Sequence, residues 1–270
     1  MQKTIAIANQ KGGVGKTTTA IHLGAGVALQ GHRTLIVDMD PQGNATTGLG
    51  FSSSSDDSGI YDLLINEAPV RDVIRHTQVE CLDIVTADTR LHGAEIELVP
   101  RIAREKILAQ ALDALDSRYR FVVIDCPPSL GLLTLNALAS ASSIIVPMQC
   151  EYFALEGLAH LMKTVKLVQK HVNPQLEIEG IVLTMFDGRL NLSKQVADEI
   201  AQVFGSRVYK TMIARNVRLS EAPSYGQPVY LYDSASRGAQ NYRELTLEFL
   251  AAQGIAPRPE VVDEKIEEAA

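Results

Sequence analysis

The chain of 270 residues lacks tryptophan, and only 5% of its residues are aromatic. Its three cysteines, Cys81, Cys126 and Cys150, are odd in number, lie far apart and form no C-x-x-C pair. That pattern excludes a disulfide framework and indicates a reducing compartment such as the cytoplasm. No apolar run reaches the ~18 residues that a membrane-spanning helix needs. We also expect no signal peptide, because the first apolar run is short and begins almost at once.

What is present is enough apolar material for a large core. Hydrophobic residues make up 46% of the chain and charged residues 21%, which argues against disorder. We find no linker, and therefore predict one domain over residues 1–254, followed by a flexible acidic tail over 255–270. The net charge of −7 is uneven, because residues 187–244 carry eight lysines and arginines against six acidic residues. A local basic patch on an acidic protein would give this distribution.

Short β-branched runs alternate with amphipathic segments along the chain. The apolar residues between 155 and 168, and those between 102 and 115, recur at helical spacing. The alternation predicts an α/β fold with a mostly parallel, twisted sheet and helices on both faces, and with ligands at the carboxyl ends of the strands. The predicted strands are residues 4–8, 34–38, 82–85, 121–125, 144–148, 180–184, 208–213 and 229–232.

A glycine-rich loop follows the first predicted strand, where residues 11–18 read Lys-Gly-Gly-Val-Gly-Lys-Thr-Thr. In a strand–loop–helix setting the loop N–H groups and the helix dipole both face a polyphosphate. Lys16 can reach the β- and γ-phosphates, and the Thr17 hydroxyl can bind Mg²⁺, so the loop predicts ATP with magnesium. The predicted nucleotide ligands here are Lys11, Gly12, Gly13, Val14, Gly15, Lys16, Thr17 and Thr18.

The loop departs from the ordinary phosphate-binding pattern in two places. Gln10 stands where that pattern has its first glycine, and a second lysine, Lys11, opens the loop. A cation at this position can meet the charge that develops on a transferred phosphate.

Acidic residues end two of the predicted strands. Asp125 closes an apolar run, where a carboxylate can hold Mg²⁺ directly or through water. Asp38 and Asp40 close another, and their spacing of two places both side chains on one face of a strand. One of the two can then face Mg²⁺ or the phosphates while the other orients water, and Asp38 is the predicted metal residue. Asp-Pro and Gly-Asn are also ordinary turn chemistry, and both interpretations can hold together.

The motif Lys-Gly-Gly-x-Gly-Lys-Thr resembles the deviant Walker A motif of the ParA/MinD group of ATPases. Residues 125–131, 149–157 and 215–223 resemble segments of the ParA/Soj type of that group, which acts in DNA partition. The resemblance covers residues 3–252 and implies a single-domain P-loop ATPase.

Several site roles are implied by this resemblance alone. Lys11 would reach across a dimer interface to the nucleotide of the partner, and Asp40 would polarise the attacking water. Arg215 and Asn216 would line the adenine pocket, and Glu151 would lie near the partner's nucleotide. The family often has proline where this chain has Ala214, which weakens the expected backbone contact to adenine.

The resemblance further implies an ATP-dependent homodimer that binds double-stranded DNA without sequence preference. The matching positions are Arg189 and Arg218, with Lys194, Lys210 and Arg237 as further candidates. Arginines on exposed loops contact phosphates through charge, although alone the two are also ordinary solvated residues. A ParB-type partner would stimulate slow ATP hydrolysis, and the protein would be cytoplasmic and associated with the nucleoid.

Three other functions stay open. A MinD-like ATPase at a membrane surface needs a basic amphipathic helix, whereas residues 259–270 are acidic and have no aromatic side chain. A protein like the nitrogenase iron protein needs two cluster-binding cysteines per subunit, and their expected placement is not evident. A small-molecule kinase or ligase needs an acceptor pocket, which the sequence neither shows nor excludes.

Overall fold

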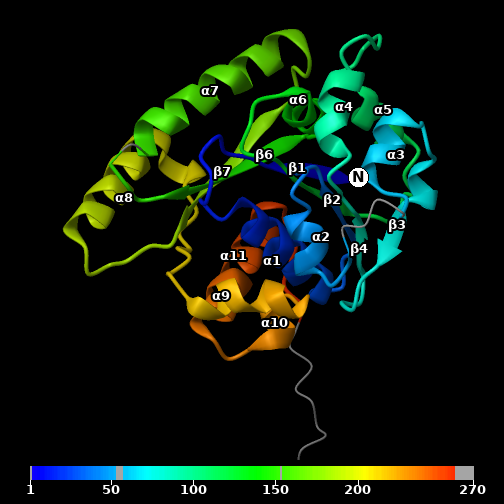
Figure 1. The fold of residues 1–270 in the computed structure, drawn as a ribbon. Coiled ribbons are helices and arrows are strands. Elements are labelled where there is room, and N and C mark those ends of the chain that lie inside the picture. The colour runs from blue at the N-terminus through cyan, green and yellow to red at the C-terminus, as the bar shows by residue number, and fades with distance from the viewer. Residues whose placement is uncertain (1, 53–56, 153, 259–270) are drawn as a thin grey trace, which may run out of the picture.

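The computed structural model describes residues 2–52, 57–152 and 154–258. Within these residues the core is a seven-stranded sheet in the order β3-β4-β2-β5-β1-β6-β7 (Figure 1). All neighbours pair in parallel except β3 with β4, which confirms the predicted parallel sheet. The strands are β1 (Lys3–Ile7), β2 (Thr34–Asp38), β3 (Ile74–His76), β4 (Leu82–Val85), β5 (Phe121–Asp125), β6 (Ser143–Gln149) and β7 (Glu177–Thr184).

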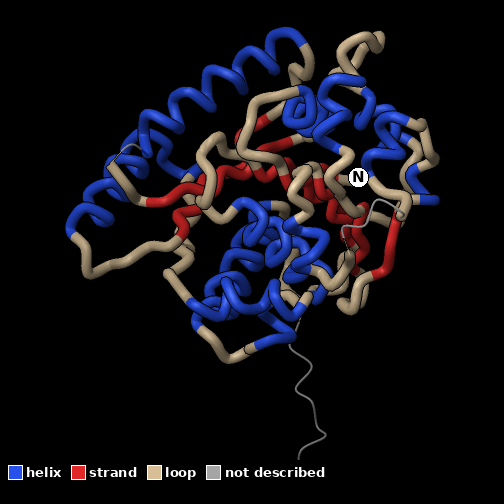
Figure 2. Tube along the Cα trace, viewed as in Figure 1, coloured by secondary structure: helices blue, strands red, loops and turns tan. Residues whose placement is uncertain are grey.

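Helices cover both faces of the sheet, as predicted (Figures 1 and 2). One face carries α3 (Ile60–Ile65), α4 (Leu91–Glu97), α5 (Ile107–Asp113), α6 (Leu132–Ser140), α7 (Ala154–His171) and α8 (Asn191–Phe204). The other carries α1 (Lys16–Leu29), α2 (Asn44–Gly48), α9 (Val217–Glu221), α10 (Val229–Tyr232) and α11 (Arg237–Ala252). Short 3₁₀ turns lie at Val70–Asp72, Gly205–Arg207 and Ala222–Tyr225.

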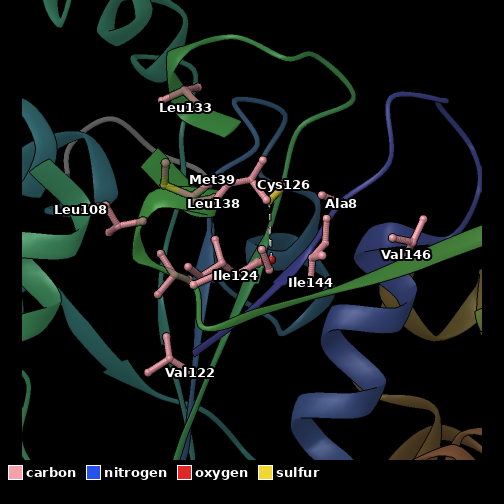
Figure 3. Packing of buried hydrophobic residues seen from close by; sticks show 14 of the residues in the cluster. Ala8, Met39, Leu108, Val122, Ile124, Cys126, Leu133, Leu138, Ile144 and Val146 are labelled. Carbon is pink, nitrogen blue, oxygen red and sulfur yellow. Dashed lines mark hydrogen bonds between the residues drawn. The ribbon is translucent and has the colours of Figure 1, made fainter. Parts of the chain in front are cut away.

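The central strands are buried on both faces, and alternate residues feed two hydrophobic clusters. Val122 and Ile124 of β5 enter one cluster, while Phe121 and Val123 enter the other. Packing continues beyond the strand ends, where Met39 and Cys126 lie with Leu138 of α6 (Figure 3). This packing gives the loops at the carboxyl ends of β2 and β5 a rigid base.

Two predicted strands are wrong. Residues 208–213 form no strand. They run beside the sheet edge, where Val208 bridges Ile181 and the Ile213 N–H donates to the Leu183 carbonyl of β7 at 2.8 Å. Residues 229–232 form α10 instead, because the Pro228 carbonyl accepts from the N–H groups of Leu231 and Tyr232. The β-branched and aromatic composition of that run had predicted a strand, but it has no strand to pair with. The short, partly polar strand β3 was not predicted.

The helix predicted from the apolar residues between 155 and 168 is confirmed as α7. The helix predicted from those between 102 and 115 begins later in the structure than its apolar pattern indicated. Ile102 is 96% exposed and lies outside α5, which begins at Ile107. The Asn136 side chain accepts from the Leu108 N–H and binds the first turn of α5 to α6. Tertiary contact therefore decides where this helix begins.

The predicted tail falls mainly outside the described residues, since residues 259–270 are not among them. Of the described part, Ile255 packs against the core and the Arg258 N–H donates to the Gln30 side chain at 2.8 Å. In the described part of the chain, none of the helices is both long and apolar enough to span a bilayer.

Candidate nucleotide site

The predicted phosphate-loop and strand-end residues converge at the carboxyl ends of the central strands. Strands β2, β5, β1 and β6 are neighbours, and all point their carboxyl ends the same way. Asp125 pairs in register with Asp38 on one side and with Ile7 on the other. The glycine loop that leaves β1 therefore lies beside both strand-end carboxylates, as parallel strands require.

The glycine loop has the backbone that a polyphosphate needs. Gly13 and Gly15 have φ angles of 75° and 84°, a left-handed backbone conformation that residues other than glycine rarely adopt. A Cβ built at Gly12 or Gly13 would meet no atom within 4 Å, so the loop borders open space. Gly15 is the N-cap of α1 and offers no capping side chain. The first N–H groups of α1 thus remain available to an anion.

Two side chains that the sequence did not single out hold this loop. Gln149 at the end of β6 donates to the Gly13 carbonyl at 3.1 Å. Thr184 at the end of β7 donates to the Val14 carbonyl at 2.8 Å. Both are polar residues at the carboxyl ends of predicted strands, and that position was the available signal for them.

The two lysines of the loop have different surroundings. The Lys16 ammonium donates to the Lys11 carbonyl at 3.2 Å and is almost fully buried. Burial lowers the pKa of Lys16, and the charge of Asp125 opposes that shift. The Lys11 side chain is 44% exposed and forms an ion pair with Glu151 of the same chain. The structure thus brings together Lys11 and Glu151, two residues linked to the dimer interface only by resemblance.

Asp125 is a buried carboxylate of the site that lacks hydrogen-bond donors among the described residues. Both of its carboxylate oxygens are buried, and no described residue donates a hydrogen bond to either. Burial and the charge of Asp38 raise the pKa of Asp125 well above its usual value, while Thr17 and Lys16 oppose the rise. Such a carboxylate fits a cation that arrives with a ligand.

The described residues include no cluster of three or more His, Cys, Asp or Glu side chains that would hold a metal by themselves. Magnesium characteristically takes one or two carboxylates and completes its shell with water and phosphate oxygens. The Asp125 carboxylate and the Thr17 hydroxyl fit that donor set.

Asp38 is buried as well, but its carboxylate has three donors. It accepts from the Asp40 N–H at 3.1 Å and from both the N–H and the hydroxyl of Thr46 at 2.8 Å. Burial raises the pKa of Asp38 to about 6 despite these bonds. The Asp40 carboxylate accepts from the Gln42 N–H at 3.0 Å, which confirms the turn expected there. Asp38 thus orders the loop that carries Asp40, with Thr46 as a partner that the sequence did not reveal.

A pocket of about 250 Å³ continues from the loop toward α9 and α11. Arg215 and Asn216, the expected adenine-side residues, both line it. Asn216 also caps α9, because its side-chain oxygen accepts from the Arg218 N–H at 2.9 Å. Other residues that line this pocket are Gly15, Thr18, Pro223 and Tyr242.

A larger groove of about 910 Å³ lies beside this pocket and shares Arg215 with it. Three of the candidate DNA-binding residues, Arg189, Lys210 and Arg237, line the groove. Asp187 and Glu244 are the acidic residues of its lining. The groove therefore has an excess of positive charge, whereas Lys194 and Arg218 lie outside its lining.

The two arginines predicted to contact DNA are both in ion pairs. Arg189 binds the Asp187 carboxylate through Nε at 2.9 Å and Nη2 at 2.7 Å. Arg218 contacts Glu221 at 2.8 Å and Asp233 at 3.1 Å. All of these groups are at least partly exposed, so the pairs are weak and exchange readily.

The parallel sheet, the glycine loop after β1 and the carboxylate at the end of β5 together define the P-loop class of nucleotide-binding proteins. A family model described as AAA domain matches residues 2–178.

Two relatives with known names show to which family within this class the chain belongs. The sporulation initiation inhibitor protein Soj of Bacillus subtilis is 57% identical over 254 residues, which cover 94% of this chain and 100% of that protein. The chromosome partitioning protein ParA of Myxococcus xanthus is 50% identical, covering 92% of this chain and 88% of that protein. This chain belongs to the Soj/ParA family of chromosome partitioning proteins.

The fold is also similar to a crystal structure of cobyrinic acid a,c-diamide synthase from Mycobacterium smegmatis with a bound ATP analogue and magnesium. That protein is 35% identical, with a TM-score of 0.81 over 96% of this chain and 100% of the other.

Proposed function

We propose that this protein is an ATP-dependent switch that partitions DNA. In this proposal the ATP-bound protein forms a homodimer, binds double-stranded DNA without sequence preference on the nucleoid, and releases it after slow hydrolysis stimulated by a ParB-type partner. The observation that carries the proposal is the phosphate loop with its extra lysine, Lys11, exposed at the surface and paired only with Glu151 among the described residues. The names of the Soj and ParA relatives support the partition role.

The loop N–H groups, the first turn of α1 and Lys16 bind the phosphates in this proposal. Lys16 is held in position by the Lys11 carbonyl, and its buried ammonium is not screened by water. Thr17 and Asp125 hold magnesium, which neutralises charge on the phosphate oxygens when it is bound.

Asp40 orients the attacking water, and Asp38 holds Asp40 by accepting its backbone N–H. Phosphoryl transfer passes through a loose transition state, so orientation of water matters more than complete removal of its proton. Lys11 exchanges Glu151 for the partner's nucleotide when the dimer closes. That exchange replaces a half-exposed ion pair of small net value with a cation–phosphate contact inside an interface.

The basic groove supplies the DNA contact in this proposal. Arg189, Lys210, Arg215 and Arg237 bring four cations against the two acidic residues of the lining. Phosphates would displace Asp187 from Arg189, as counterions are displaced when cations bind a duplex. Arg215 lines both cavities, so the occupant of the nucleotide pocket bears directly on one groove cation.

The test is DNA binding against salt concentration with ADP, with ATP, and with ATP for the Lys11→Ala, Asp40→Ala, Arg189→Glu and Arg218→Glu variants. We expect binding that needs ATP, ignores sequence and weakens steeply with salt. The Lys11 and arginine variants should lose it, and the Asp40 variant should keep it.

Arg118→Glu is the matched control, because Arg118 pairs with the aspartate two positions before it, as Arg189 does. It should bind as the unmodified protein does. ATP hydrolysis without DNA binding under any nucleotide would contradict the DNA role, and flotation with liposomes would then test a membrane-surface role.

A further inference from the structure

A buried histidine lies directly behind the nucleotide pocket. His22 is on α1, one turn after the glycine loop, and its side chain is almost fully inaccessible. Its Nε2 accepts from the Val229 N–H at 3.0 Å, and its Nδ1 contacts the Thr18 carbonyl at 2.6 Å. Because the Val229 N–H can only donate, Nε2 carries no proton, and Nδ1 therefore donates to Thr18. The ring is held neutral in one tautomer by Thr18 of its own helix and by Val229, which lies 207 residues from His22 in the sequence.

Two tyrosines complete this arrangement. The Tyr242 ring stacks on His22 with centroids 4.9 Å apart, and its hydroxyl lies 3.1 Å from that of Thr19. The Tyr230 hydroxyl donates to the His22 carbonyl at 3.0 Å. The first turns of α1 are thus joined to α10 and α11 through buried hydrogen bonds, which are costly to leave unmade.

These contacts reach both walls of the nucleotide pocket, although His22 does not line it. Thr18 and Tyr242 are lining residues, and the chain from Arg215 to Pro223 contributes Arg215, Asn216, Leu219, Ser220 and Pro223 to the lining. That chain leads to Val229, where α10 begins. His22 therefore joins the phosphate-binding end of the site to the segment that forms its base-side wall.

We infer that His22 is a positioning residue that sets the base-side wall of the nucleotide pocket relative to the phosphate loop. The inference rests on the proposed binding of ATP at this site. A change at His22 should affect the two parts of the ligand differently, because the phosphates contact the loop of α1, while the base contacts the wall that His22 holds. A histidine with only a packing role would affect both parts equally.

The test uses two substitutions that differ in one hydrogen-bonding group. His22→Phe keeps a ring against Tyr242 but removes the acceptor for the Val229 N–H. His22→Gln restores an acceptor near the position of Nε2. Each protein is titrated by calorimetry, in the presence of Mg²⁺, with the slowly hydrolysed analogue ATPγS and with inorganic tripolyphosphate.

For His22→Phe we expect ATPγS affinity to fall about tenfold, while tripolyphosphate affinity changes less than about twofold. His22→Gln should bind both ligands within about threefold of the unmodified protein. An equal loss for both ligands, or no loss for either, would overturn the inference and leave ATP binding intact. An unmodified protein that binds neither ligand would overturn the proposed function itself.

Val229→Pro gives the same test from the other partner if His22→Phe does not fold. Val229 is the first residue of α10, where proline is well tolerated, and the preceding residue already has an extended backbone. This substitution removes the N–H that His22 accepts, so it should lower the affinity for ATPγS selectively. Equal effects on both ligands would again overturn the inference.

Discussion

Two buried aspartates on neighbouring regions of one sheet differ in how the fold treats them. Asp83 of β4 accepts from Arg33 at 3.1 Å, from the Tyr119 hydroxyl at 2.6 Å and from His76 at 2.5 Å. Burial would raise the pKa of Asp83, but these donors bring it below its usual value. Among the described residues Asp125 has no such donor at bonding distance, and its pKa is raised even though Thr17 and Lys16 oppose the rise. The protein neutralises a structural carboxylate with its own side chains and leaves the one at the site for a ligand.

Asp125→Asn removes the carboxylate that has no donor among the described residues, and we expect the largest effect from this substitution. Removing the carboxylate takes away the charge that holds magnesium, so ATP hydrolysis should fall about 10³-fold or more. The nucleotide-free variant should also unfold at a higher temperature, because an unpaired buried charge is gone. Steady-state hydrolysis and thermal unfolding measure the two effects. Asp116→Asn, at an exposed position, is the control, and an unchanged rate in Asp125→Asn would contradict the metal role.

The same substitution at the other aspartate, Asp83→Asn, should destabilise the protein and leave ATP binding almost unchanged. It leaves Arg33 without its anion in a partly buried position and weakens the bonds from Tyr119 and His76. We expect a loss of about 2–3 kcal/mol in the free energy of unfolding, measured by urea denaturation. ATP affinity at a temperature where the variant is folded should stay within about twofold. A stable variant with weakened ATP binding would mean that the two aspartates do not differ in role.

Asp38 should make the stability of the protein depend on pH in the direction opposite to Asp83. Its pKa is raised from 3.8 to about 6 in the folded protein, mainly by burial. The folded protein keeps this proton where the unfolded chain loses it, so the contribution of Asp38 to stability is lost as pH rises from about 4 to above 6. The free energy of unfolding of Asp38→Asn, relative to that of the unmodified protein, should therefore rise by on the order of 1–3 kcal/mol from pH 4.5 to pH 7.5. Urea denaturation at both pH values tests this.

Asp83→Asn is the counterpart for that experiment. Because the pKa of Asp83 is lowered, its stabilisation is present above the usual aspartate pKa and is lost as pH falls through the folded value. The cost of Asp83→Asn should thus shrink only below about pH 4. The same sign of pH dependence in both variants would contradict the assignment of a lowered pKa to Asp83 and a raised pKa to Asp38.

The smallest effects lie within the Asp83 cluster. Tyr119→Phe removes one buried hydrogen bond and should cost about 1 kcal/mol of unfolding free energy. His76→Ala should cost less than about 0.5 kcal/mol, because the His76 side chain is 79% exposed. Urea denaturation ranks the two variants. A larger cost for His76→Ala than for Tyr119→Phe would show that burial does not decide the worth of these bonds.

Local sequence patterns predicted which residues come together at the candidate site. The order of strand, glycine loop and helix, and the carboxylates at strand ends, depend on spacings within a few residues, which local backbone geometry translates directly. The same locality explains the confirmed sheet and α7. It also explains the failure at residues 229–232, where local preference indicated a strand and the backbone of Pro228 closed a helix.

Which of these groups have hydrogen-bond or ion-pair partners depends on contacts between segments far apart in the sequence. Lys11 meets Glu151 across 140 residues, Thr184 reaches Val14 across 170, and Val229 reaches His22 across 207. Asp125 has no donor at all among the described residues, a property of everything packed around it. Burial and pairing are set by contacts between distant segments. The residues that gather at the candidate site could therefore be predicted from the chain, whereas their charge states and hydrogen-bond partners are set by the folded sheet.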